Sequence, residues 1–213
     1  MRSPRVAAIA VRLTRLLIGL VLYGVAEGLM IQASIGVGPW TVFAQGVARH
    51  TGAGVGWLTN LIGLAVLLFW IPLRQRPGVG TILNILVVGT VMEVALDVLP
   101  APASVWLRAP LFLVGLVLLA FACGVYVGAG LGPGPRDGLM TGLHARTGRP
   151  IWLVRGGIEV SVLAAGWLLG GDVGVGTLVE ALAIGPLVGW FLPRLDPRFS
   201  TGGEVGRAQQ PAR

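Results

Sequence analysis

The sequence matches itself at an offset of 96 residues, and this internal repeat constrains the fold more than any other feature. Positions 19–96 align with positions 115–192 without a gap, and 24 of the 78 aligned pairs are identical. The clearest matches fall at breaks between apolar runs, where Gly36-Val-Gly-Pro39 aligns with Gly132-Pro-Gly-Pro135. Shared apolar composition does not explain identities of Gly and Pro at such breaks. The chain is therefore a tandem duplication, and its two halves are expected to share one architecture.

Each half holds three apolar runs that are long enough to cross a bilayer. Only 12% of the residues are charged, whereas soluble domains carry about 25%, and the mean hydropathy is +0.82. A hydrocarbon core of about 30 Å needs about 20 apolar residues in a helix. The expected spans are 14–35, 57–73, 79–99, 109–131, 151–170 and 174–193. The sequence thus predicts an all-α polytopic membrane protein with six transmembrane helices.

A shorter element, 39–50 or 135–147, lies between the first two spans of each half. About 12 helical residues cover only about 17 Å of that core, so these elements are too short to span. Each follows a Gly-x-Gly-Pro break, formed by Gly36, Gly38 and Pro39 or by Gly132, Gly134 and Pro135. Two interpretations stay open: an interfacial amphipathic helix that turns the chain, or a re-entrant half-helix whose positive N-terminus points into the membrane.

The orientation follows from the number of spans and from the arginines. Three spans per half is an odd number, so the second half is expected to be inverted relative to the first. All 16 basic residues are Arg. With a cytoplasmic N-terminus, fourteen of them fall on the inner side and only Arg49 and Arg108 on the outer side. Both termini are therefore predicted to be cytoplasmic, in the cytoplasmic membrane of a bacterium whose high-GC genome the Lys-free composition suggests.

These patterns divide the chain into five segments. They are a basic cytoplasmic N-terminal segment (1–13), membrane repeat 1 (14–99), an external linker (100–108), membrane repeat 2 (109–193) and a disordered cytoplasmic tail (194–213).

Several classes of function are excluded by what the sequence contains. The formal charge of +7 comes from arginines that flank apolar runs, which is typical of a membrane protein and not of a nucleic-acid interface. Cys123 is the single cysteine, and His50 and His144 have no ligand spacing around them. No nucleophile motif or Walker loop occurs. We therefore expect no enzyme activity, no catalytic residue, no metal and no cofactor.

Acidic residues lie inside the predicted spans. A charge at bilayer depth costs at least about 2.5 kcal/mol, so such residues face the protein interior. They are Glu27, Glu93, Glu159 and Glu180, with Asp97 near a span end. Structural contacts between helices and a role in transport are both compatible with this pattern. Six tryptophans near span ends (Trp40, Trp57, Trp70, Trp106, Trp152 and Trp190) are interpreted as an aromatic belt.

A binding site is predicted in the second half. Arg136 and Asp137 open the short helix, and Arg155 and Glu159 lie one turn apart in the fifth span. We expect these four residues to line an inward-facing vestibule for a polar or anionic solute. Glu159 is the predicted proton-coupled group, and Glu27 and Glu180 would continue the path. The alternative is an Arg155–Glu159 pair at i, i+4 that only locks the helix.

Five motifs in the second half resemble those of a known family. They are Gly-x-Gly-Pro-Arg-Asp-Gly-Leu-Met (132–140), Val-Arg-x-x-Ile-Glu (154–159), Gly-Trp-Leu-Leu-Gly-Gly (166–171), Val-Gly-Val-Gly-Thr (173–177) and Ile-Gly-Pro-Leu (184–187). They resemble the bacterial YczE/YyaS/YitT-type integral membrane proteins, and YczE most closely. The resemblance covers about residues 14–193. It implies a polytopic membrane protein and brings no established substrate. The family pattern has Asp after Pro-Trp, where this chain has Thr41.

The leading hypothesis from the sequence is a small secondary transporter or exporter of an unidentified solute. The alternative is a membrane accessory or scaffold protein that transports nothing. The expected partners are the lipid bilayer and a small solute, with a second copy of the chain as an open alternative and no nucleic acid.

Overall fold

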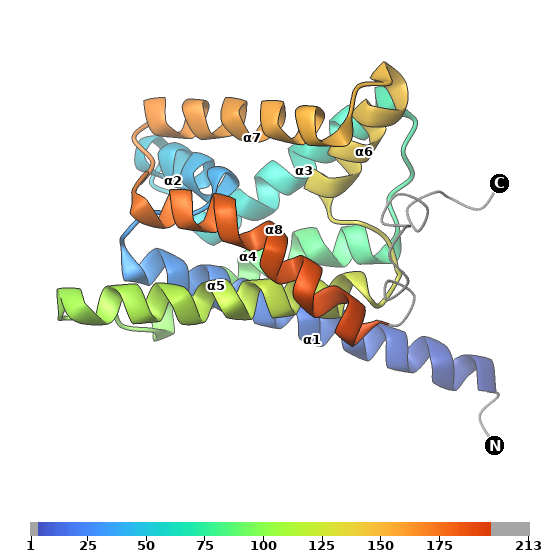
Figure 1. The fold of residues 1–213 in the computed structure, drawn as a ribbon, viewed down its shortest axis with the longest axis horizontal. Helices are drawn as coiled ribbons and strands as arrows, with labels where there is room; N and C mark the ends of the chain where they lie inside the picture. The colour runs from blue at the N-terminus through green and yellow to red at the C-terminus, as the bar shows by residue number, and fades with distance from the viewer. Residues whose placement is uncertain (1–3, 197–213) are drawn as a thin grey trace.

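The computed structural model describes residues 4–196 and folds them into helices (Figure 1). These are α1 (Pro4–Ala33), α2 (Pro39–Thr51), α3 (Val55–Leu73), α4 (Val79–Val98), α5 (Val105–Val127), α6 (Pro135–Thr147), α7 (Ile151–Leu168) and α8 (Val175–Leu195). All except α2 and α6 are long and apolar enough to cross a membrane. The predicted all-α fold with six membrane helices is confirmed. The predicted tail lies, from residue 197 onward, outside the described residues.

The short helices α2 and α6 begin at the two prolines of the Gly-x-Gly-Pro breaks. Gly38 (φ −64°, ψ 159°) and Gly134 (φ −62°, ψ 160°) precede them with almost the same extended backbone. Proline suits the first helical position because its missing N–H would have no intrahelical acceptor there. Both helices end in a left-handed glycine, Gly52 or Gly148. The repeat in the sequence is therefore also a repeat of local backbone structure.

The two halves interlock at these breaks. Gly36 (φ +106°) and Gly132 (φ +118°) have backbone angles that only glycine adopts readily. Next to them, the Gly176 N–H at the start of α8 donates to the carbonyl of Ile35 (2.8 Å). In the same way, the Gly80 N–H at the start of α4 donates to the carbonyl of Leu131 (2.8 Å). The last helix of each half thus begins against the break of the other half.

Helices α1 and α5 pack closely against each other and run antiparallel. A Cβ on Gly19 would meet Tyr126, and a Cβ on Gly115 would meet Met30, so the middle of each helix lies against the end of the other. Met30 packs with Phe112 in the main core cluster. Helix α4 packs against α1, and α8 packs against α5. Small residues at these crossings allow the close approach that membrane helices need.

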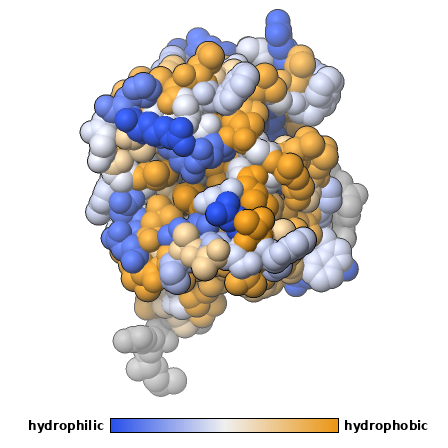
Figure 2. Space-filling model, turned by 90° about the vertical axis from the view of Figure 1, so that its left-hand side faces the viewer, coloured by the Kyte–Doolittle hydropathy of each residue, from blue (hydrophilic) through white to orange (hydrophobic). Residues whose placement is uncertain are grey.

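Helix α7 breaks the similarity between the halves. Helix α3 packs against α4, but α7 contacts mainly α2 and α6 and has no comparable packing on α8 among the described residues. In Figure 1, α7 lies along the opposite side of the bundle from α1 and α5. Glycines of α7 and α8 such as Gly157 and Gly185 face open space. Figure 2 looks along the helices at one end of the bundle, where hydrophilic and hydrophobic side chains both reach the surface. Along the helices, large apolar side chains such as Leu68 and Leu182 are exposed, as expected where lipid is the solvent.

Helix α1 begins about ten residues before the predicted span, at Pro4. Residues 5–13 contain no Gly or Pro, so nothing in the sequence interrupts the helix there. Arg12 Nε donates to the carbonyl of Ala129 (2.8 Å), and Arg15 Nη2 donates to the carbonyl of Leu195 (2.5 Å). These arginines place positive charge at the C-terminal ends of α5 and α8, where it is favourable.

Candidate functional site

Buried polar groups gather where α2 begins, inside the helix bundle. Glu27 of α1 is 4% exposed, and its Oε2 accepts a hydrogen bond from the hydroxyl of Thr41 (2.9 Å). The Glu180 carboxylate of α8 lies directly against Gly38, because a Cβ on Gly38 would come within 2.2 Å of Oε1. We call Glu27, Gly38, Trp40, Thr41 and Glu180 the α2 half-site. Its two carboxylates face the positive N-terminal end of α2, which partly offsets their charge.

Glu180 is not fully satisfied by the protein. The residue is 8% exposed, and its Oε2 has no hydrogen-bond partner within the described part of the chain. Glu27 and Glu180 also interact electrostatically with each other. Two buried carboxylates in a membrane interior are costly, so this arrangement makes the α2 half-site a candidate functional site.

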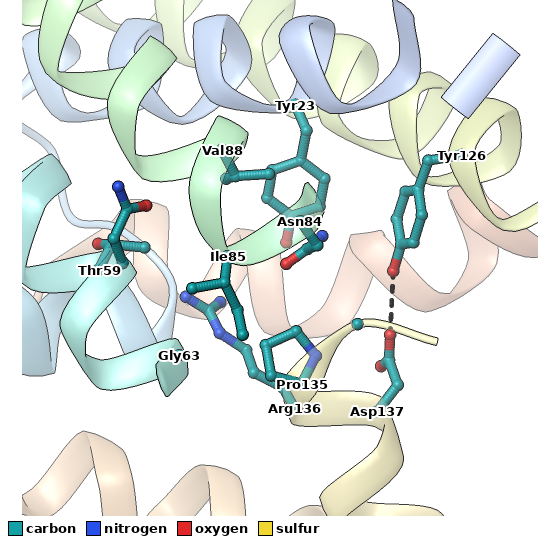
Figure 3. Close-up of a pocket in the computed structure, with 12 residues that line it drawn as sticks. Tyr23, Thr59, Gly63, Asn84, Ile85, Val88, Tyr126, Pro135, Arg136 and Asp137 are labelled. Carbon is teal, nitrogen blue, oxygen red and sulfur yellow. Dashed lines mark hydrogen bonds between the residues drawn. The ribbon is translucent and has the colours of Figure 1, made fainter. Parts of the chain in front are cut away.

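A corresponding set of residues lies where α6 begins (Figure 3). The hydroxyl of Tyr126 donates to Asp137 Oδ2 (3.0 Å), and Asn84 also lies close to Gly134, with Nδ2 3.7 Å from where a Cβ would stand. We call Asn84, Tyr126, Gly134, Arg136 and Asp137 the α6 half-site. These residues border a cavity of about 60 Å³, which is also lined by polar groups of neighbouring helices, Tyr23, Thr59 and Asn60. The cavity is large enough for one or two water molecules.

Arg136 connects the two half-sites. Its guanidinium lies over the ring of Trp40, 5.1 Å from the centroid. It is also the positive charge that acts on Glu27, Glu159 and Glu180. Trp40 and Arg136 are themselves separated by the repeat offset, so this cation–π contact joins equivalent positions of the two halves. Trp40 is 6% exposed, and its interpretation as a belt residue is wrong because its ring lies inside the bundle.

The structure brings together most of the predicted site residues. Arg136, Asp137, Glu27 and Glu180 all belong to the two half-sites. Glu159 of α7 is half-buried and interacts with Arg136 and Trp40. Arg155 is exposed. It forms no ion pair with Glu159, since the one ion pair within 4.0 Å in residues 4–196 joins Arg49 and Asp172. The predicted locking pair is therefore not formed.

The fourth intramembrane glutamate has a structural role. Glu93 Oε2 accepts a hydrogen bond from the Gly56 N–H (2.7 Å) at the start of α3. This bond satisfies a backbone donor that would otherwise be free in the first turn. Within residues 4–196, no group of three or more His, Cys, Asp or Glu side chains is arranged to hold a metal ion.

The sequence analysis missed Trp40, Thr41 and Tyr126 as site residues. One available signal was the offset itself, because Thr41 and Asp137 are equivalent positions and the latter was already a candidate. Tyr126 has no such signal, since Met30 is its equivalent.

Six membrane helices around a buried, charged interior define an integral membrane protein with a polar internal site. Residues 10–193 match the model of a family of unknown function (DUF6198). The chain is 41% identical over 177 residues to an "Uncharacterized protein" of Haemophilus influenzae, covering 83% of this chain and 81% of that protein. It is 34% identical over 178 residues to the "Uncharacterized membrane protein YczE" of Bacillus subtilis, covering 83% of each. No solved structure matches the chain. The chain therefore belongs to a YczE-like membrane protein family, as its motifs predicted.

Proposed function

We propose that this protein is a small secondary transporter or exporter built from two inverted three-span repeats. It would lie in the bacterial cytoplasmic membrane with both termini in the cytoplasm and move a small polar solute between its two half-sites. The observation that carries the proposal is the pair of polar half-sites, each formed at the N-terminus of a short helix that begins within the bundle. Several transporter folds bind substrate where interrupted helices meet near the middle of the membrane.

The antiparallel packing of α1 and α5 supports an inverted arrangement of the two halves. The contacts of the short helices are also exchanged between the halves. Helix α6 packs against α3, with Trp70 donating to the carbonyl of Pro135 (3.0 Å). At the equivalent place α2 packs against α7, where Gly166 lies against Phe43. Such an exchange is expected for a two-fold axis that lies in the membrane plane and passes near Trp40 and Arg136.

The burial of the break before α2 favours a re-entrant helix over an interfacial one. Val37 is 1% exposed, and Trp40, Thr41 and Val42 on the first turn are also buried. The exposed residues of α2 are at its other end, at Arg49, His50 and Thr51. An interfacial helix would instead expose one face along its whole length.

The unequal packing of α7 suggests how the site could open. In an inverted repeat, the two alternating states differ by exchanging the conformations of equivalent elements. Helix α3 packs on α4, whereas α7 is separated from α8, so α7 is the element that would move to expose Glu159 and Arg136. A ligand that binds one of these two packings more tightly than the other would shift the population toward that packing.

The experiment that tests the proposal is reconstitution of the full chain into liposomes with a trapped pH-sensitive dye. Pools of amines, amino acids, organic acids and sugars are added under an imposed proton gradient. We expect at least one pool to change the lumenal pH faster than in protein-free liposomes. If no pool moves protons, and no pool is taken up when it is radiolabelled, the protein is not a transporter and the accessory or scaffold alternative holds.

A further inference from the structure

The α2 half-site contains more negative than positive charge. Glu27 and Glu180 are both more than nine-tenths buried, and Glu159 lies close enough to add to their field. Arg136 is the cation that acts on all three carboxylates. Arg155 acts on Glu159 from an exposed position. An uncompensated carboxylate in a membrane interior is strongly unfavourable, so the half-site needs either a bound proton or positive charge from a ligand.

One oxygen of the half-site is available to such a ligand. Glu27 Oε2 is occupied by the hydroxyl of Thr41. Glu180 Oε2, in contrast, is buried and has no partner within residues 4–196, although its residue is 8% exposed. A buried acceptor without a donor costs free energy, and a ligand that supplies an N–H or O–H group recovers it.

The ring of Trp40 shows which kind of cation fits. It is 6% exposed, and the guanidinium of Arg136 already covers it at 5.1 Å. A flat, delocalised cation is therefore accommodated between the ring and the carboxylates, where both attract it. Because that cation is tethered to α6, a free cation of the same class would compete with it for Trp40.

We propose that the α2 half-site binds a small organic cation with N–H donors, of the guanidinium or ammonium class, in exchange for a proton held by Glu27 and Glu180. This inference rests on the proposed transporter function and adds the charge class of its solute. The cation displaces the Arg136 guanidinium from Trp40 and donates to Glu180 Oε2. The O–H bond of the pair breaks, and the proton leaves to water. One positive charge enters for each that leaves, so the exchange is electroneutral.

The other titratable or charged groups that face the pair come from four helices. They are Tyr23 of α1, Cys123 of α5, Arg136 of α6 and Glu159 of α7. Because Arg136 is the positive charge nearest to both carboxylates, its displacement by a ligand is the step that changes their charge balance.

The transport test uses guanidinium as the probe. The full chain is reconstituted with an acidic lumen, and guanidinium chloride or sodium chloride is added outside at equal concentration. We expect guanidinium to drive lumenal alkalinisation that sodium does not drive. Glu180→Gln should slow it about tenfold or more, as expected for loss of a charge-assisted hydrogen bond. Glu27→Gln should also slow it, because the pair then has one carboxylate fewer to hold the exchanged proton. Glu93→Gln is the matched control, because an amide oxygen still accepts from the Gly56 N–H, and its rate should be unchanged.

The binding test does not depend on transport. In weakly buffered mild detergent, guanidinium should release protons from the wild-type protein but not from Glu180→Gln. It should also change the tryptophan fluorescence of the wild-type protein but not of Trp40→Phe. Tetramethylammonium has no N–H donor and should bind about tenfold more weakly. Thermal unfolding of each variant establishes that it is folded.

The outcomes separate this inference from the function on which it rests. If gluconate or an uncharged solute moves protons and guanidinium does not, the transporter stands and the cation class is wrong. If tetramethylammonium equals guanidinium, or if Glu180→Gln responds like the wild type, the assignment of Glu180 Oε2 is wrong. If no solute is transported and guanidinium neither binds nor releases protons, both proposals are wrong.

Discussion

The α2 and α6 half-sites have nearly the same backbone and different chemistry. Gly38 and Gly134 agree within a few degrees in φ and ψ. At the positions of Glu27 and Glu180 in the first half-site, however, the second has Cys123 and Asn84. The α2 half-site thus holds two buried carboxylates, and the equivalent positions in the second half hold a thiol and an amide. The duplication supplied one backbone twice, and substitution of a few side chains then made one copy ionisable and the other neutral at these positions.

In the first turn of each short helix, the difference in acidic residues between the two half-sites is partly reversed. Thr41 of α2 donates to Glu27, whereas its equivalent, Asp137 of α6, accepts from Tyr126. Each half-site therefore contains one hydroxyl-to-carboxylate hydrogen bond, but the acid is on α1 in one and on the short helix in the other. The hydrogen bond is the common element, and the helix that carries the negative charge is what differs.

The largest expected effect concerns the orientation of the two half-sites. Thr51 and Thr147 are exposed at the ends of α2 and α6. In a Cys123→Ala background, Thr51→Cys should react fully with an impermeant maleimide applied from outside the cell. Thr147→Cys should react only after permeabilisation, because an odd number of spans separates the two positions. Equal reaction of both cysteines from outside would show that the halves are not inverted.

A smaller and unequal effect is expected from the glycines before the two short helices. A Cβ on Gly38 would come within 2.2 Å of Glu180 Oε1, whereas a Cβ on Gly134 would lie 3.3 Å from Asp137 Oδ2. Gly38→Ala should therefore displace Glu180 and cost about 1–3 kcal/mol, and Gly134→Ala should cost less than about 1 kcal/mol.

Unfolding by SDS titration in mild detergent measures both glycine variants. Neither glycine has a positive φ, so alanine adds no backbone strain at either position, and each variant is a control for the other. If Gly134→Ala is as destabilising as Gly38→Ala, the two breaks differ less in packing than their distances indicate.

The two hydroxyl-to-carboxylate bonds should also contribute unequally to stability, with effects comparable to those of the two glycines. Thr41→Val leaves the buried Glu27 without its donor and should cost about 1.5–3 kcal/mol, the usual range for a hydrogen bond to a charged group. Tyr126→Phe removes the donor of the half-buried Asp137 and should cost about 1 kcal/mol, because that carboxylate is reached more easily by water.

The same SDS titration orders these two substitutions, and double-mutant cycles with Glu27→Gln and Asp137→Asn isolate each bond. A coupling energy near zero at Thr41 and Glu27 would mean that the first bond contributes nothing to stability.

The elements of the fold could be read from the sequence, but the contacts of the site could not. Pro39 and Pro135 were expected to start short helices, and they do, because proline and glycine act on their own local backbone. The start of α1 was missed, since a hydropathy pattern detects the apolar span and not a polar helical extension in front of it.

The contacts of the site could not be predicted from the spacing of residues within one helix. The i, i+4 spacing of Arg155 and Glu159 allows an ion pair that the structure does not form, because Arg155 is exposed and Arg136 of another helix interacts with Glu159. The contact between Arg136 and Trp40 depends on how α2 and α6 meet in space. Sequence spacing gives no information about such a meeting, although the repeat offset identifies the two residues as equivalent.

The interlocked starts of α4 and α8 have a consequence for how the chain is made. The Gly80 N–H is bonded to the carbonyl of Leu131, which follows α4 in the chain and is separated from it by the whole of α5. Until the second half folds against it, the first half therefore has the N–H at the start of α4 unpaired and Glu27 without the contact that α8 later provides. These polar groups stay unsatisfied in the membrane until the second half is in place. Two separately expressed halves should accordingly accumulate only when both are present in the same cell.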